Sequence, residues 1–167
     1  MPGPREQNDY LRGGRQDRLI RELDHDPYKS KRKLTEPTVC PDCGAVFHKG
    51  RWQWATPEPG AHEVLCPACD RIRDKVPAAF VSIGGSFYEE HRDELNNLLK
   101  HVEERQKGRH PLERIMWTES EGHDTLYSVT DHHLARAMGE ALHDAYEGEL
   151  DYEYTEGETM LRVSWHR

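Results

Sequence analysis

The chain has no long hydrophobic run and few apolar residues of any kind. Only 35% of its 167 residues are hydrophobic and 8% are aromatic, and the mean hydropathy is −0.98. No stretch is long enough to span a bilayer, and the first residues contain no apolar segment typical of a secretion signal. We therefore expect a cytoplasmic protein without membrane contact, whose small core needs an additional source of stability.

Sequence motifs of common enzyme classes are also lacking. The chain contains no P-loop, no nucleophile elbow, no dinucleotide-binding glycine motif and no H-E-x-x-H zinc motif. Asp131, His132 and His133 stand together, but adjacent side chains on a helix point about 100° apart. Asp131 is better explained as a helix cap. We expect no catalytic residue, no small-molecule substrate and no enzymatic activity.

Cysteine is scarce, and its arrangement is the strongest signal in the sequence. The chain has four cysteines. They form two C-x-x-C pairs, Cys40 with Cys43 and Cys66 with Cys69. Two such pairs facing each other supply the four ligands of a closed tetrahedral site, for which zinc is the natural occupant. A structural zinc ion contributes roughly 10–16 kcal/mol of apparent binding free energy, so the segment around these cysteines should fold around metal.

Two alternatives to zinc remain open at this point. Disulfides are disfavoured because a reducing compartment keeps thiols free. A rubredoxin-type iron site uses similar spacing with a glycine after the second ligand of each pair, where a positive φ turns backbone amides toward sulfur. Gly44 fills that position in the first pair, whereas Asp70 fills it in the second. Iron is therefore the less favoured metal.

Charge is distributed unevenly along the chain. The net charge is −8. The segment from Pro111 onward contains four basic and thirteen acidic residues, while the first 110 residues carry a net charge of +1. Because phosphate contacts come from clustered lysine and arginine, any contact with RNA should involve the front of the chain.

Candidate contact residues fall into two groups. Some basic residues lie at the expected turn around Lys49 and Gly50, which we call the tip, and others follow the second cysteine pair. Two tryptophans that could stack on bases lie close to the tip in the sequence. These tentative RNA contacts are Lys49, Arg51, Trp52, Trp54, Arg71, Arg73 and Lys75. The alternative is that they form a solvated surface on which the tryptophans pack. A second, acidic group suited to a basic protein partner comprises Glu149, Asp151 and Glu153.

The pattern of the sequence predicts an α+β protein in three parts. Residues 1–36 are polar and read as a flexible arm. Residues 37–85 read as a four-Cys zinc ribbon with a turn at Lys49 and Gly50, closed by a hinge at Gly84 and Gly85. Residues 86–167 read as a small α-β-β-α-β-β domain, in which helices cover one face of an antiparallel sheet.

The elements of the third part follow from local signals. Ser86 and Glu89 suggest a capping box that opens one helix to about Lys107. Residues 111–118 and 125–129 read as strands, and Asp131 should cap a second helix that ends near Gly148. Alternating apolar and polar residues predict a hairpin of residues 150–154 and 161–165, with its turn near Gly157.

Several stretches together resemble a bacterial family of small zinc-ribbon proteins of unassigned role. The stretches are CPDCGAVFHKGRWQW, LCPACDRIRDKVPA, HRDEL, HPLERIM, HHLARAMGEALHDAYEGEL and LRVSW. More weakly, CPDCG, LCPAC and LYSVTDHHLARAMGEAL are similar to the N-terminal part of the archaeal and eukaryotic adaptor of the large ribosomal subunit, the nonsense-mediated-decay adaptor family. That adaptor is far longer and has more cysteine pairs.

This resemblance implies a non-catalytic zinc-ribbon docking protein that associates with the ribosome or with ribosomal RNA. The alternative is an adaptor that uses the acidic C-terminal sheet to bind a basic protein, without contact to RNA. Loss of binding after nuclease treatment would distinguish the first role from the second.

Overall fold

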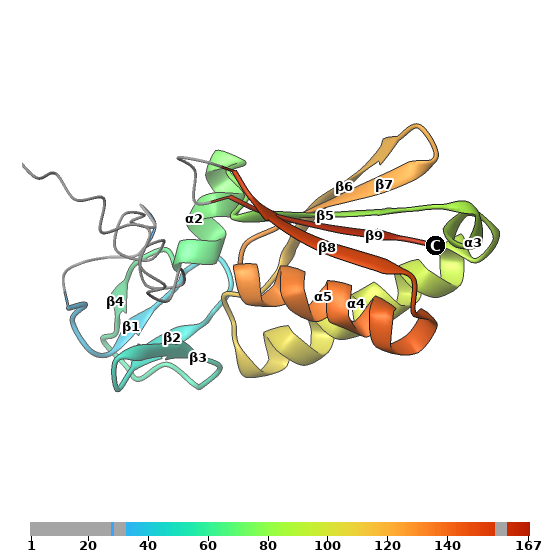
Figure 1. The fold of residues 1–167 in the computed structure, drawn as a ribbon. Coiled ribbons are helices and arrows are strands. Elements are labelled where there is room, and N and C mark those ends of the chain that lie inside the picture. Colours follow the sequence, from blue (N-terminus) through green and yellow to red (C-terminus); the bar gives the residue numbers. More distant parts are fainter. Residues whose placement is uncertain (1–27, 29–32, 156–159) are drawn as a thin grey trace, which may run out of the picture.

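The computed structural model describes residue 28, residues 33–155 and residues 160–167 (Figure 1). Most of the expected arm and the expected turn near Gly157 lie outside these residues. Within the described part of the chain, no helix combines the length and apolar character needed to cross a bilayer. The described residues form a small cysteine-containing unit and a larger α+β unit.

The first unit, called the cysteine module below, spans residues 37–75. A four-stranded sheet with the order β3-β2-β1-β4 is followed by helix α2. Its elements are β1 (Thr38–Val39), β2 (Val46–His48), β3 (Arg51–Gln53), β4 (His62–Glu63) and α2 (Pro67–Asp74). The predicted turn between β2 and β3 is present: Lys49 and Gly50 have φ angles of 50° and 79°, as expected for a two-residue turn that matches strand twist.

The second unit is a five-stranded sheet covered by helices on one face (Figure 1). The strand order is β6-β7-β5-β9-β8. Its elements are β5 (Ala79–Gly84), α3 (Ser86–Glu90), α4 (Arg92–Arg109), β6 (Ile115–Glu121), β7 (Asp124–Val129), α5 (His132–Tyr146), β8 (Glu149–Tyr154) and β9 (Leu161–His166). The predicted mixture of helices and strands is thus confirmed.

Strand β5 corrects the expected boundary at residue 85. Residues 79–84 were expected to end the cysteine segment, but they form the central strand of the larger sheet. The strand pairs with β7 in antiparallel and with β9 in parallel orientation, so the sheet is mixed rather than wholly antiparallel. The glycines predicted as a hinge are packed into the larger unit: Gly84 is paired with His166 in the sheet, and a Cβ on Gly84 or Gly85 would lie within 2.3 Å of Asp124 or of the backbone of Arg167.

The helix expected from Ser86 to about Lys107 is divided in two. His91, with φ −120°, separates α3 from α4, and its ring stacks on Phe87 with 4.1 Å between centroids. Ser86 is not the N-cap as predicted. Gly85 occupies that position without a side-chain hydrogen bond, and the backbone N–H groups of Phe87 and Tyr88 donate to the carbonyl oxygen of Arg167 instead.

The main core lies between the sheet and helices α4 and α5. Alternate residues of β5 and β9 face the helices and are fully buried, which is the period expected for a half-covered sheet. The largest buried side chains in this core include Trp165, Tyr88, Leu99, Met138 and Leu142. The predicted cap of α5 is confirmed, since the carboxylate of Asp131 accepts a hydrogen bond from the N–H of His133 at 2.7 Å.

Candidate metal centre

The four cysteines come from two short backbone turns. Cys40 and Cys43 lie in the loop between β1 and β2, where Gly44 takes a φ of 81° and the N–H of Ala45 points to Cys43 Sγ at 3.5 Å. Cys66 is the N-cap of α2, and its Sγ accepts a hydrogen bond from the N–H of Cys69 at 3.3 Å. Each turn therefore aims a backbone donor at sulfur, as Gly44 predicted for the first pair; in the second pair, where Asp70 replaces the glycine, the start of α2 supplies the donor.

The sulfur atoms have the spacing of a metal site rather than of disulfides. All four cysteines are unpaired, and their Sγ atoms lie within 4.8 Å of one another. Cys43 and Cys66 are 3.8 Å apart. A tetrahedral zinc site with bonds of about 2.3 Å has sulfur–sulfur edges of about 3.8 Å, whereas a disulfide needs about 2.05 Å. The four residues fit a tetrahedral ion with little movement.

The electrostatics of the cluster also favour a bound cation. Burial raises the pKa of Cys66, and burial raises the pKa of Cys69 to about 11. Burial opposes ionisation of Cys40 as well, but backbone N–H groups of residues 66, 43 and 42 lower its pKa to about 7. Thiolates at Cys66 and Cys69 therefore require compensating positive charge, which a metal ion would supply because coordination deprotonates the thiol outright.

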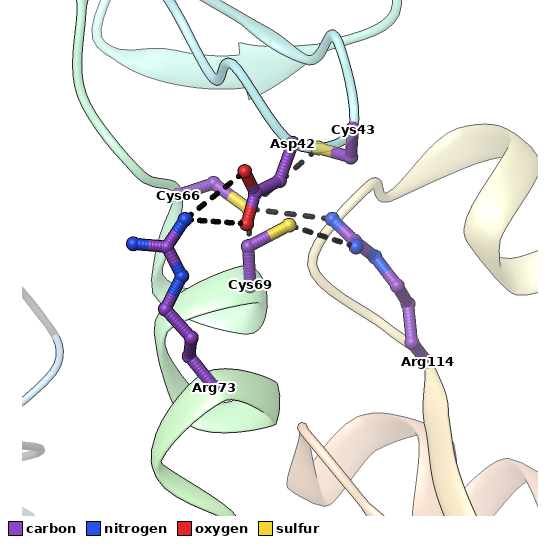
Figure 2. A network of polar contacts seen from close by, with 6 residues as sticks. All are labelled: Asp42, Cys43, Cys66, Cys69, Arg73 and Arg114. Atoms are coloured by element: carbon purple, nitrogen blue, oxygen red, sulfur yellow. Dashed lines mark hydrogen bonds and ion pairs between the residues drawn. The ribbon is translucent and has the colours of Figure 1, made fainter.

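Arg114 provides further positive charge from the other unit. Its guanidinium donates to Cys69 Sγ at 3.1 Å and to Cys66 Sγ at 3.3 Å (Figure 2). The residue is only 8% exposed, and although this burial lowers its pKa, the neighbouring sulfurs outweigh that effect and hold the pKa above the ordinary arginine range. Sequence reasoning missed this residue. It lies 45 positions beyond Cys69, and nothing in its local sequence distinguishes it from a surface arginine.

The loop that carries Arg114 joins the metal centre to the sheet. Arg114 Nε donates to the carbonyl of Pro111 at 2.9 Å, and its backbone N–H donates to Thr130 Oγ1 at 2.8 Å. Leu112 packs against the buried cysteines. The four-sulfur cluster is thus enclosed by both units, and four protein ligands would leave a tetrahedral ion no vacant position.

Glu113 is a second buried charged residue in this loop. It is 4% exposed, and its Oε1 has no hydrogen-bond partner among the described residues. Burial raises the pKa of its carboxyl group to about 7, repulsion from Asp131 adds to the shift, and His133 opposes it. No local signal in the sequence marks this glutamate as buried.

The two tryptophans of the expected RNA surface have structural partners. Trp52 is half-buried, packs against the cysteine cluster and meets Phe47 edge-on with 5.5 Å between ring centroids. Trp54 is 39% exposed, and its indole N–H donates to the carbonyl of Lys107 at 2.6 Å. Trp54 therefore fastens the cysteine module to the end of α4 while leaving part of its ring accessible.

The five basic residues of the expected RNA surface do not form one patch. Lys49 and Arg51 are exposed at the β2–β3 tip. Arg71 is 6% exposed and donates to the carbonyl of Val76 at 3.1 Å. Arg73 forms an ion pair with Asp42 at 3.1 Å (Figure 2), and exposed Lys75 caps the end of α2. Of these five, only Arg71 is buried, and Lys49 and Arg51 are the two that lie together on one exposed turn.

The predicted acidic residues do share one surface. Glu149, Asp151 and Glu153 are exposed at alternate positions of the edge strand β8. Leu150 and Tyr154, which alternate with them, pack against the core. The carboxylates therefore lie on the sheet face opposite α4 and α5.

Comparisons with protein-family models, with curated proteins and with solved structures give no match for this chain. The resemblance to small zinc-ribbon proteins and to the ribosomal adaptor therefore stays a prediction from the sequence. The observation that stands independently of any relative is the enclosed four-cysteine cluster.

Proposed function

We propose that the chain is a non-catalytic docking protein built on a zinc ribbon, and that it associates with the ribosome or another structured RNA. The observation that carries the proposal is the enclosure of four cysteine sulfurs by both units of the molecule. A closed four-thiolate site serves stability rather than catalysis, because no position is left for a substrate. In this role the metal fixes the orientation of the β2–β3 tip relative to α4.

Zinc is the proposed metal, with iron the alternative. Four thiolates with zinc leave a net charge of −2, which the guanidinium of Arg114 on two of the sulfurs partly offsets. Elemental analysis of the purified protein should give one zinc per chain and a colourless solution. A visible absorption band with one iron per chain would contradict the choice of metal and leave the structural role intact.

The proposed RNA contact is the accessible part of the tip. Lys49 and Arg51 are exposed there, and the hydrogen bond from Trp54 to Lys107 brings the basic end of α4, with Lys107 and Arg109, next to it. Cationic side chains beside a partly exposed indole are the usual components of a surface that binds the phosphate backbone and stacks on bases. The cytoplasm is the compartment in which we expect this contact.

Sedimentation of a tagged copy with ribosomes at several salt concentrations tests the proposal. The double substitution Lys49→Gln and Arg51→Gln should weaken association and reduce the slope of log K against log salt by about 0.7–0.9 for each lost phosphate contact. The matched control Lys100→Gln removes an exposed charge from the middle of α4 and should leave the slope unchanged. A wild-type protein that remains at the top of the gradient in every growth phase would overturn the proposal.

A further inference from the structure

The face of the five-stranded sheet opposite α4 and α5 is covered by no described element. Its surface can be assigned from the strand registers, because directly paired residues share one face. One row across the sheet runs Trp117, Ser128, Phe80, Arg162 and Glu153. The next row runs Glu119, Leu126, Ser82, Ser164 and Asp151.

These rows place carboxylates along both margins of the face. The acidic residues are Glu119, Glu121 and Asp124 at the β6–β7 side, and Glu149, Asp151 and Glu153 on β8. Against six carboxylates, the described residues of the face include one guanidinium, that of Arg162, and one imidazole, that of His166. Arg162 lies over the ring of Phe80 at 5.1 Å, and His166 pairs with Asp124 at 3.4 Å. The other carboxylates remain exposed.

The centre of the face has apolar and hydroxyl groups. Ser82 and Ser164 are paired across β5 and β9, and half-buried Leu126, Phe80 and Trp117 lie beside them. Ser128 Oγ is buried there without a hydrogen-bond partner in the described part of the chain. The acidic margins therefore flank a central strip of apolar and hydroxyl groups; we call the whole face the acidic trough and the central strip its floor.

We propose that the acidic trough binds a lysine- and arginine-rich amphipathic helix of a partner protein. Four strand spacings separate β6 from β8, or about 19 Å. A helix with its side chains is about 10–12 Å wide, so a helix lying along the strands can reach carboxylates on both sides. A leucine stripe would contact the floor, while long basic side chains extend to the margins. RNA does not suit this face, because its phosphates would meet six carboxylates.

This docking surface is independent of the proposed contact between the tip and RNA. The trough lies on the larger sheet, whereas the tip belongs to the cysteine module and contacts α4 through Trp54 (Figure 1). A docking protein with both surfaces would join an RNA to a basic protein. Either surface can fail its test without affecting the other.

Titration with a designed peptide tests the trough in the full, metal-loaded protein. The probe is a synthetic 18-residue helix with a leucine stripe flanked by lysines, and its controls are the same peptide with glutamate for lysine and a version with a central proline, which breaks the helix. We expect salt-sensitive binding of the probe alone. Amide NMR shifts should change at Ser82, Leu126 and Ser164.

Charge-neutralising variants locate the contact. The triple substitution Glu149→Gln, Asp151→Asn and Glu153→Gln, and separately Glu119→Gln with Glu121→Gln, should each weaken binding by about five- to tenfold. The matched control Glu90→Gln, Glu104→Gln and Asp144→Asn removes three exposed carboxylates from the helices and should change affinity less than twofold. Circular dichroism spectra of the variants, compared with that of the wild type, show whether each variant keeps the fold.

Five results would overturn the proposal, four of them from the peptide titrations and one from competition with RNA. The first four are failure of the wild type to bind the probe, an equal loss in the control variant, equal binding of the proline peptide, and shift changes confined to the helices or to the cysteine module. Displacement of the probe by an oligouridine RNA at the same amides would also assign this face to nucleic acid instead.

Discussion

At the scale of single residues, Arg114 has the most consequential position in the molecule. A buried guanidinium loses its hydration and is stable only if its charge and its N–H donors are matched. Here they are matched by two sulfurs and a backbone carbonyl. Donors to a ligating sulfur hold the ligand in place and tune its basicity, so Arg114 belongs functionally to the metal centre.

Replacing Arg114 should lower the affinity of the cysteine cluster for metal. We expect Arg114→Met to lower zinc affinity by about 10–100-fold, the usual effect of removing a group that bonds to metal ligands. Competition with a chromophoric chelator at constant pH measures the change. Arg73→Met is the matched control, because Arg73 lies in the same network but its side chain is 60% exposed and pairs with Asp42. Equal losses in both variants would contradict the role of Arg114.

Glu113 should make stability depend on pH. Its pKa is about 7 in the folded protein and about 4.5 when exposed, so between these values the folded state binds more protons and stability falls as pH rises. From pH 6 to pH 8 the free energy of unfolding of the wild type should fall by about 1 kcal/mol relative to that of Glu113→Gln. Urea unfolding of the metal-loaded proteins measures the difference in free energy of unfolding between the wild type and Glu113→Gln. Glu104→Gln, which changes an exposed carboxylate, is the control. A difference that is the same at both pH values would refute the prediction.

The sequence predicted the ligands but not their buried neighbours. A C-x-x-C pair is recognisable because both ligands lie within one turn of the chain. Arg114 and Glu113 become special only because a loop from the other unit closes over the cluster. Burial of Arg71 is likewise a tertiary effect, and it removes one of the predicted RNA contacts from the surface.

At the scale of elements, α5 shows how packing can override helix propensity. Gly139 lies in the interior of this helix, where glycine normally costs about 1 kcal/mol relative to alanine. A Cβ at this position would lie 2.7 Å from Val163 Cγ1 and 2.8 Å from Leu150 Cδ1. The glycine allows α5 to approach β8 and β9 closely, and that contact closes one side of the core.

A pair of glycine substitutions tests this interpretation. Gly139→Ala should reduce the free energy of unfolding by about 1–3 kcal/mol through overpacking. Gly108→Ala is the matched control in α4, because a Cβ there would have no neighbour within 4 Å, and it should stabilise the protein by up to about 1 kcal/mol. Urea unfolding gives both values. Stabilisation by both substitutions would show that α5 does not pack against the sheet in this way.

Element prediction succeeded where the signals are local. The Asp131 cap, the β8–β9 hairpin and the Lys49–Gly50 turn depend on residues within a few positions of one another. Strand β5 was missed because its position in the sheet depends on parallel pairing with β9, about 80 residues further along the chain. The replacement of Ser86 as the cap depends in the same non-local way on the carbonyl of Arg167, which accepts from the N–H groups of Phe87 and Tyr88.

At the scale of the whole molecule, the two units differ in how they are stabilised. The larger unit has a core of sixteen buried residues that contains large apolar side chains. The core of the cysteine module consists of three cysteines and two alanines, with four further half-buried residues packed on it. Small apolar cores of this kind rarely suffice without a metal or disulfides.

Metal removal should therefore unfold one unit and not the other. After chelation, hydrogen exchange should accelerate in β1–β4 and around Arg114, while β5 and β9 keep their protection, since their contacts do not involve the cysteines. Mass spectrometry of exchanged peptides measures this, and added zinc should restore the original rates. Uniform loss of protection across the sheet would mean that the metal holds the entire fold.

The sequence by itself determined the two cysteine pairs that form the candidate metal centre, the alternation of the strands and the segregation of acidic residues into the C-terminal third, because each can be read directly from the order of residues. Only the tertiary structure decided which charged residues stay accessible, that β5 is the central strand, and that Arg114 completes the sulfur cluster. These features depend on contacts between residues far apart in sequence, and their energies arise from burial and pairing that no local pattern encodes.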